Sequence, residues 1–280
     1  SVYPFTKMIF NRHLLNKASG TKQNKMKELI FKTKEELFAT DLTGCTTIIC
    51  SGLENLTFLP ELPEGLESLY CKHTMVDWSK QVLPDSLQEL FCCGRPPRNT
   101  GITTPNFNNL PKGLVRFYCC RAGFTNLPGL PAGLEELMAE NNFLTSLPDM
   151  PATLKKIYVR ENAISELPKL PATLKKLYVS DNRLTRLPKL SHTKLIEIYT
   201  TDNELTSLPD LPETLQELYL CDNKITHLPE LPNSLKELYI SNNKLTSMPS
   251  IPEGIEELLA TNNRGIEVPE VGVRYFMKFV

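Results

Sequence analysis

Apolar and polar positions recur along this chain with a period of about 20 residues. With few exceptions, several windows share the pattern P-x-x-L-x-x-L-Y-x-x-x-N-x-L-T-x-L-P. They are residues 131–147, 151–167, 171–187, 212–228 and 232–248. A fixed period of this size is typical of stacked units, none of which can bury its apolar face alone. The chain is therefore expected to form a solenoid.

Each repeat contains one short segment with strand periodicity. In Leu177, Tyr178 and Val179 the side chains alternate between core and surface, as a strand requires, and neighbouring repeats are expected to pair in parallel. Pro168 and Pro171 cannot donate to a β-ladder and favour polyproline II. The pattern predicts an α/β repeat solenoid with a parallel sheet on the concave face and an extended, polyproline II-like convex side.

The repeats divide the chain into three parts. About eleven repeats are expected within residues 43–266, and residues 267–280 would form a closing cap or begin a further segment. A Pro/Gly/Asn-rich loop, residues 94–109, lengthens one repeat. The first apolar positions of the repeats are Thr46, Leu66, Leu87, Leu114, Leu134, Leu154, Leu174, Leu195, Leu215, Leu235 and Ile255.

Residues 1–42 have a different pattern, with apolar side chains near helical spacing in two runs separated by Gly20. These side chains are Phe5, Met8, Ile9 and Leu15, then Met26, Leu29, Ile30, Leu37 and Phe38. We expect a helical hairpin that caps the open end of the stack, because the first repeat of a solenoid otherwise exposes its core edge.

One asparagine recurs where the chain turns away from each strand. Backbone groups buried at that turn need both a donor and an acceptor, which an amide side chain supplies, so this column is expected to be structural. Its members are Asn142, Asn162, Asn182, Asn203, Asn223, Asn243 and Asn263.

The signature L-P-x-L-P with L-x-x-L-x-x-x-x-N resembles the LPX-type leucine-rich repeats of secreted bacterial effectors, a family that includes Yersinia outer protein M and the IpaH-type ubiquitin ligases. The resemblance covers residues 46–266, and the expected helical hairpin also resembles that family's cap. Early repeats depart from it, since Arg95 and Ala122 replace the Asn, and Ser191 replaces a Pro. The resemblance implies a protein delivered by a bacterial secretion system into the host cytosol, where it binds a host protein.

An aromatic column is expected down the centre of the concave face. Its positions are Tyr70, Phe91, Tyr118, Met138, Tyr158, Tyr178, Tyr199, Tyr219, Tyr239 and Leu259. Tyrosine suits strands and can stack on its neighbours, which is a purely structural interpretation. A continuous exposed aromatic stripe also marks binding surfaces. We favour partner binding by Tyr118, Tyr158, Tyr178, Tyr199, Tyr219 and Tyr239.

Charge is segregated along the repeats. Residues 155–194 hold ten basic side chains against three acids, and residues 195–257 hold twelve acids against three lysines. Such polarity would orient a partner, although drift on solvated faces gives the same pattern. The candidate charged contacts are Lys156, Lys176, Arg160, Glu197, Glu217 and Glu237. Nucleic acid is a poor partner, because the acidic block would repel phosphates.

The sequence contains few candidate catalytic or metal-binding residues. The four histidines are scattered, and no phosphate loop, nucleophile elbow or H-E-x-x-H motif occurs, so no enzyme activity, metal or cofactor is expected. The acids Asp181, Asp202 and Asp222, each one residue before an Asn, could hold a cation, but solvated carboxylates are the favoured interpretation.

The eight cysteines do not resemble a disulfide framework, which indicates a reducing compartment. Cys71, Cys92 and Cys119 fall at a core position, where free cysteine behaves as a small hydrophobe. Cys93 and Cys120 should face outward, but no C-x-x-C pair accompanies them.

The net charge of −1 argues against a general nucleic-acid or membrane binder. No apolar run reaches the roughly 18 residues of a membrane span, and no N-terminal secretory signal is evident. The start at Ser1 and the apolar end suggest a piece of a longer protein. We therefore expect a non-enzymatic interaction module. An alternative is the substrate-recognition domain of a bacterial E3 ubiquitin ligase whose catalytic domain follows Val280, and a self-assembling scaffold is a third.

Overall fold

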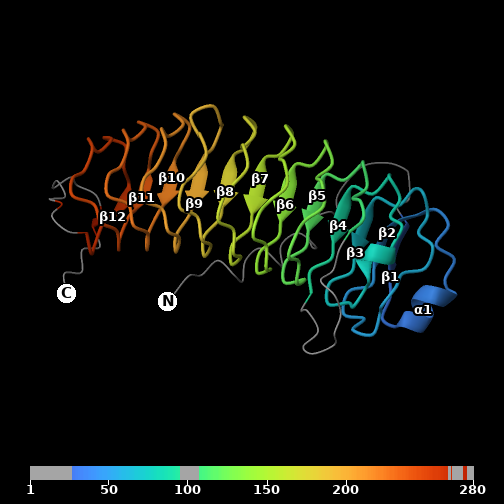
Figure 1. Cartoon of the computed structure of the whole chain (residues 1–280). Helices are drawn as coiled ribbons and strands as arrows, with labels where there is room; N and C mark the ends of the chain where they lie inside the picture. The colour runs from blue at the N-terminus through green and yellow to red at the C-terminus, as the bar shows by residue number, and fades with distance from the viewer. Residues whose placement is uncertain (1–26, 95–106, 264–265, 267–273, 276–280) are drawn as a thin grey trace.

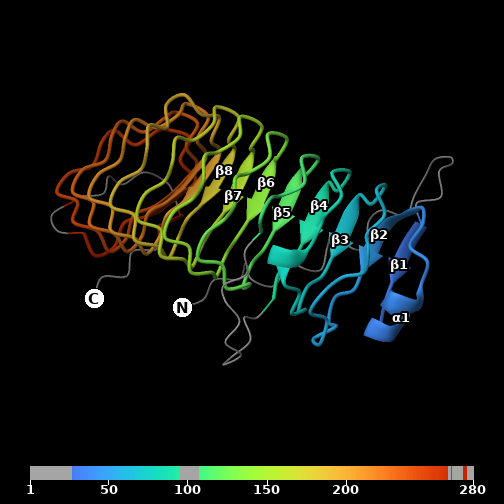
Figure 2. The same ribbon diagram turned by 45° about the vertical axis from the view of Figure 1, so that its right-hand side comes forward.

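The computed structural model describes residues 27–94, 107–263, 266 and 274–275. Over these residues the chain forms stacked coils whose strands make one parallel 13-stranded sheet, in sequence order from β1 to β13 (Figure 1). The sheet lines one side of the coils, and the other side is extended chain (Figure 2). The predicted repeat solenoid is therefore confirmed.

Strands are short because each coil contributes only one sheet segment. They are β1 Lys27–Ile30, β2 Cys45–Ile49, β3 Ser68–Tyr70, β4 Glu89–Phe91, β5 Arg116–Tyr118, β6 Glu136–Met138, β7 Lys156–Tyr158, β8 Lys176–Tyr178, β9 Glu197–Tyr199, β10 Glu217–Tyr219, β11 Glu237–Tyr239, β12 Glu257–Leu259 and β13 Arg274–Tyr275. One α-helix, α1 (Lys34–Ala39), and a 3-10 helix at Trp78–Lys80 complete the described elements.

Strand register places equivalent residues of successive repeats side by side. Leu218 pairs with Ile198 on β9 and with Leu238 on β11, and all three side chains are fully buried. The first and third residues of the three-residue strands, β3 to β12, point away from this core, as alternation requires. Every repeat position therefore becomes a column along the solenoid.

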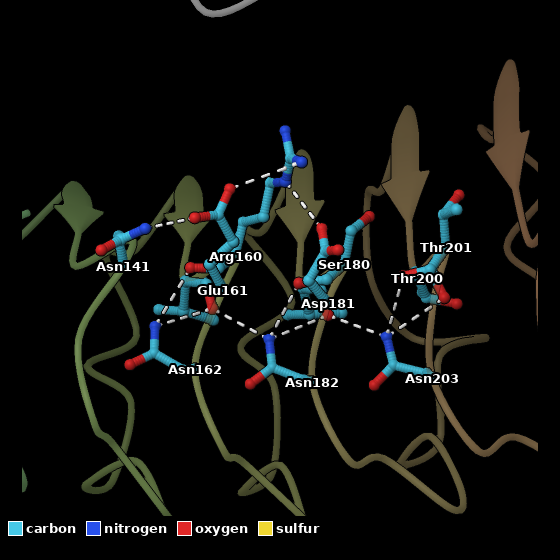
Figure 3. Close-up of polar contacts among 12 residues, drawn as sticks. Asn141, Arg160, Glu161, Asn162, Ser180, Asp181, Asn182, Thr200, Thr201 and Asn203 are labelled. Atoms are coloured by element: carbon cyan, nitrogen blue, oxygen red, sulfur yellow. Dashed lines mark hydrogen bonds and ion pairs between the residues drawn. The ribbon is translucent and has the colours of Figure 1, made fainter. Parts of the chain in front are cut away.

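The asparagine column has the structural role that the sequence predicts (Figure 3). The Asn182 side-chain Nδ2 donates to the carbonyl oxygens of Val179 and Ser180 in its own repeat, at 3.1 Å each, and of Val159 in the preceding one, at 3.0 Å. Its Oδ1 accepts from the Ile164 N–H at 3.0 Å. Each Asn thus joins two coils through backbone groups at the turn, and one of the four partners of Asn182, the Ser180 carbonyl, also accepts a backbone N–H from the neighbouring coil.

The residue before each Asn of this column adopts the left-handed conformation. The φ angle is 55° at Asp181, 54° at Asp202 and 57° at Asp222. Among residues with a Cβ, Asn and Asp tolerate this conformation best, because their short polar side chains bond locally. The acidic column therefore has a backbone explanation.

The N-terminal part differs from the expected helical hairpin. Lys27–Ile30 forms β1 and pairs in parallel with β2, so the helix predicted for Leu29 and Ile30 is wrong. A short apolar run fits either element, and here the unpaired edge of β2 supplies the hydrogen bonds that decide between them. Helix is confined to α1, which begins with a capping box made by Thr33 and Glu36.

Several expectations lie outside the described residues. The first arm of the hairpin (residues 1–26), residues 95–106 of the expected loop and most of residues 267–280 belong to this group. The division of the chain at residues 42 and 266 stays a prediction.

Candidate functional site

Two columns of side chains cover the outer face of the sheet, which we call the sheet face. The first residue of each strand from β5 to β12 gives a charged column: Arg116, Glu136, Lys156, Lys176, Glu197, Glu217, Glu237 and Glu257. The third residue gives the predicted aromatic column from Tyr70 to Leu259. Both columns run parallel to the solenoid axis, on either side of the buried column that contains Leu218.

The tyrosine rings contact one another from β7 to β11. Ring centroids of Tyr178 and Tyr199 lie 4.3 Å apart, those of Tyr199 and Tyr219 4.1 Å, and those of Tyr219 and Tyr239 4.3 Å. In the last two pairs the rings are stacked with nearly parallel planes, at interplanar angles of 10° and 8°. These rings stabilise the sheet, since stacked aromatic pairs contribute about 0.5–1.5 kcal/mol each.

Burial separates the six tyrosines into two groups. Tyr178, Tyr199, Tyr219 and Tyr239 are half-buried and reach the surface. Tyr118 and Tyr158 are only 6% and 7% exposed, so the expectation that they form an exposed stripe is wrong. For Tyr118 the cause is a small apolar cluster on the sheet face.

This cluster contains Tyr118, Cys93 and Cys120, with Phe91 and Met138 packed against them. Cys93 and Cys120 were expected to face outward, but the cluster covers them and leaves them 7% and 6% exposed. The N–H of Cys120 donates to Cys93 Sγ at 3.2 Å. The cluster therefore leaves only a small part of Tyr118 at the surface.

A hydrogen bond joins each exposed tyrosine to the glutamate of the following repeat. The Tyr199 hydroxyl donates to Glu217 Oε2 at 2.5 Å, and Tyr178, Tyr219 and Tyr239 donate to Glu197, Glu237 and Glu257 in the same way. Partial burial and the acceptor carboxylates raise the pKa of all four phenols. The tyrosines are therefore neutral donors at any physiological pH.

The four glutamates form an in-register row of carboxylates on adjacent strands. Glu197, Glu217, Glu237 and Glu257 pair directly across β9 to β12. Parallel strands are about 4.8 Å apart, so the carboxylates repel one another. Burial, and then the charges of Glu197 and Glu237, raise the pKa of Glu217, although the Tyr199 hydrogen bond opposes the shift.

Cations in the charged column are already paired. Lys176 Nζ lies 2.6 Å from Glu197 Oε1, and Lys156 Nζ lies 3.2 Å from Glu136 Oε2. Arg160 Nε, on the same face, lies 2.8 Å from Asp181 Oδ2 (Figure 3). Within the charged column, ion pairing of the described residues thus ends at Glu197 on β9.

Beyond β9 the charged column is unbalanced. Within the described part of the chain, neither Glu217 nor Glu237 forms an ion pair, and the charge of Lys176 acts on Glu217 only from a greater distance. Lys224 and Lys236 instead pair with Glu204 and Glu256.

The geometry gives little support for a cation site at the acidic column of Asp181, Asp202 and Asp222. Arg160 and Asn242 already contact Asp181 and Asp222, and burial with these two acids raises the pKa of Asp202. Among the residues described, no cluster of three or more His, Cys, Asp or Glu side chains could hold a metal ion. The helices described there are also too short to cross a membrane.

Sequence reasoning found both columns but missed the hydrogen bonds that join them. The signal was present, because a glutamate follows each exposed tyrosine at a nearly constant interval. Tyr178 precedes Glu197 by 19 residues, and Tyr199 precedes Glu217 by 18. Because this interval is almost one repeat, it places the tyrosine of one coil beside the glutamate of the next coil, and so links the aromatic column to the charged column.

The fold and its repeated sheet face define a leucine-rich repeat solenoid. A family model described as "Leucine Rich repeats (2 copies)" matches residues 213–253. The chain thus has the leucine-rich repeat fold, and it resembles bacterial effectors built from such repeats.

Solved structures of two such effectors are similar over most of the chain. YopM from Yersinia enterocolitica WA-314 is 30% identical over 76% of this chain and 50% of its own, with a TM-score of 0.64. YopM from Yersinia pestis, described as a leucine-rich effector protein, is 29% identical over 81% of this chain and 74% of its own, with a TM-score of 0.53.

This chain thus spans half the length of the first of these structures. A Shigella effector leucine-rich repeat domain is 33% identical over 55% of this chain and 70% of its own, with a TM-score of 0.46. Comparison with curated protein sequences gave no significant match.

Proposed function

We propose that this chain is the protein-binding module of a secreted bacterial effector and that its sheet face binds a host protein. The similarity to YopM supports the effector role and, with it, delivery into the host cell. Leucine-rich repeat solenoids act as interaction scaffolds, with an extended face that many side chains share. Catalysis is not part of the proposal.

The observation that carries the proposal is the unbalanced carboxylate row beside the tyrosine stack on β9 to β12. Glu217 and Glu237 repel each other across neighbouring strands, and a partner that brings positive charge would relieve this repulsion. Carboxylates about 4.8 Å apart can share one guanidinium or ammonium group. The partner is therefore proposed to present arginine or lysine side chains to this row.

The paired cations have a different part in the proposal. Lys156, Lys176 and Arg160 remain candidate contacts, but their charges are already neutralised by acids of adjacent repeats. We assign them to orientation, since the positive half of the solenoid would repel a basic partner that docks in the wrong direction.

A matched pair of charge variants tests the sheet face. Glu217→Gln with Glu237→Gln removes two charges but keeps an oxygen to accept each tyrosine hydroxyl. Glu213→Gln with Glu230→Gln changes net charge equally at two exposed positions outside the strands. Affinity capture from host lysate first identifies the partner, and its affinity for all three proteins is then measured with purified components.

We expect the sheet-face variant to weaken binding by about 1–2 kcal/mol, or roughly five- to thirty-fold, and to reduce its salt dependence. The control variant should bind nearly as the parent does. Equal losses in both variants would show that only net charge matters, and no loss in either would place the partner elsewhere on the solenoid.

Tyrosine hydroxyls are tested separately. A Tyr199→Phe change keeps the ring stack and removes the donor to Glu217. If the hydroxyl orients the carboxylate for the partner, the variant binds more weakly while circular dichroism and thermal unfolding stay near those of the parent. Unchanged affinity would restrict the role of Tyr199 to packing.

The substrate-recognition domain of a ubiquitin ligase stays the alternative that the sequence predicts. No observation of this structure favours it over the binding module alone.

A further inference from the structure

Four cysteines occupy one core column of successive N-terminal repeats. They are Cys50, Cys71, Cys92 and Cys119, and each is at most 5% exposed. Later repeats fill the same column with Ala139, Val159, Val179, Thr200, Leu220 and Ile240. Side chains of several sizes without a sulfur atom therefore satisfy the packing at this position, and the packing alone does not require a thiol.

Cys50 and Cys71 are placed closely enough for direct contact between their sulfur atoms. Their Sγ atoms lie 3.0 Å apart. The residues before them, Ile49 and Tyr70, pair directly across β2 and β3. Parallel strands are about 4.8 Å apart, within the Cα separation of about 4.4–6.8 Å that disulfides span. A bond of about 2.05 Å requires the sulfurs to approach by about 1 Å.

We propose that Cys50 and Cys71 are a disulfide-forming pair that cross-links the first two repeats when the chain meets a disulfide oxidant. Glutathione disulfide is sufficient for the chemistry. One thiolate attacks it, forms a mixed disulfide and releases one glutathione. The second cysteine then attacks the protein sulfur of that intermediate and releases the other glutathione. Both thiols lose a proton, both are oxidised, and one glutathione disulfide is reduced to two glutathione molecules.

Burial controls when this reaction can occur. Both side chains are inaccessible in the closed solenoid, and burial, followed by the neighbouring Cys50 thiol, raises the pKa of Cys71 well above its usual value. The thiolate is the reactive species, so the closed fold protects the reduced pair. Oxidation is expected while the chain folds, or when its N-terminal repeats open.

The position of the pair gives the cross-link a consequence. Each repeat of a solenoid contacts only its neighbours, so opening proceeds readily from an end. Cys50 follows β2, which lies second from the N-terminal edge of the described sheet. A bond to Cys71 would close a loop of about 20 residues and limit the opening of this end, as disulfides that restrict the unfolded chain do.

The experiment equilibrates the full chain in glutathione buffers of increasing disulfide content, with dilute urea to permit opening. Free thiols are then alkylated and the peptides mapped by mass spectrometry. We expect a peptide pair joined through Cys50 and Cys71, with the mass of two hydrogens lost, while Cys92 and Cys119 are alkylated. Hydrogen exchange should be slower in β2 and β3 of the oxidised protein than of the reduced protein.

The variants that test the pair use residues found at the same position in other repeats. A Cys71→Val change places the residue of positions 159 and 179 in the column and should abolish the cross-link, whereas Cys92→Val should leave it unchanged. Cys50→Ala, with the precedent of Ala139, replaces Cys71→Val if the latter does not fold. The proposal is overturned if Cys50 and Cys71 remain fully alkylated in oxidising buffer. A bond of Cys71 to Cys92 instead would also overturn it.

Discussion

Replacing Asn182 by alanine tests whether the asparagine column holds the coils together. The amide makes four hydrogen bonds to backbone groups, three as donor and one as acceptor. Three of its partners, the N–H of Ile164 and the carbonyls of Val159 and Val179, belong to residues whose side chains are fully buried. Alanine removes every bond and offers no substitute.

The magnitude follows from these contacts. A typical hydrogen bond contributes about 0.5–1.5 kcal/mol net, and a buried group left without a partner costs about 1–3 kcal/mol. Asn182 is partly exposed, so water can reach some of the vacated space. We therefore expect a loss of about 3–4 kcal/mol in the free energy of unfolding.

Urea unfolding followed by circular dichroism measures this loss, with the midpoint and the slope fitted separately. Arg183→Ala changes the exposed neighbouring residue and should stay within about 0.5 kcal/mol of the parent. Asn182→Asp retains the acceptor for Ile164 but places a carboxylate oxygen beside three carbonyl oxygens, so it should destabilise at least as much as Asn182→Ala. A loss below about 1 kcal/mol for Asn182→Ala, with unchanged slope, would refute the reasoning, because it would mean that the coils need no amide bridge.

Three further changes address other columns. Asp202 has a φ of 54°, so Asp202→Val should destabilise by about 1–2 kcal/mol while Asp202→Gly is nearly neutral, as thermal unfolding will show. Leu177→Ala, at a fully buried position, should cost about 2–5 kcal/mol in urea unfolding. The raised pKa of Glu217 means that the folded chain binds this proton more tightly than the unfolded chain, so stability falls as pH rises from the unfolded value of about 4.3 through the folded value. Glu217→Gln should remove this pH dependence and raise the free energy of unfolding at pH 7 by up to about 1 kcal/mol. Thermal unfolding at acid and at neutral pH measures both effects.

The sequence was sufficient for the features that repeat. A period of about 20 residues, the Leu-Tyr-Val alternation and the prolines predict the strands, their parallel pairing and the extended return side. Asn182 could be assigned a structural role because its place at the turn implies unsatisfied backbone groups. These predictions succeed because one local pattern, used many times, must be satisfied by every copy.

Features that depend on neighbouring columns were not predictable from one repeat. The run that contains Leu29 and Ile30 is too short for its spacing to separate helix from strand, and the open edge of β2 decided the outcome. Tyr118 is buried because Cys93 and Met138 of the two adjacent repeats close around it together with Cys120 of its own repeat.

The last change of sign in the charged column falls between β8 and β9, and it determines where the proposed partner would gain most. Lys176 neutralises Glu197 at that boundary, so the first carboxylate of the row is already satisfied. Glu217 and Glu237 each have an acid on both neighbouring strands, so the repulsion is greatest in the middle of the row. Because a positive group placed between these two carboxylates relieves their mutual repulsion, binding energy should concentrate at β10 and β11. Substitutions at the ends of the row should then cost less than substitution of Glu217 or Glu237.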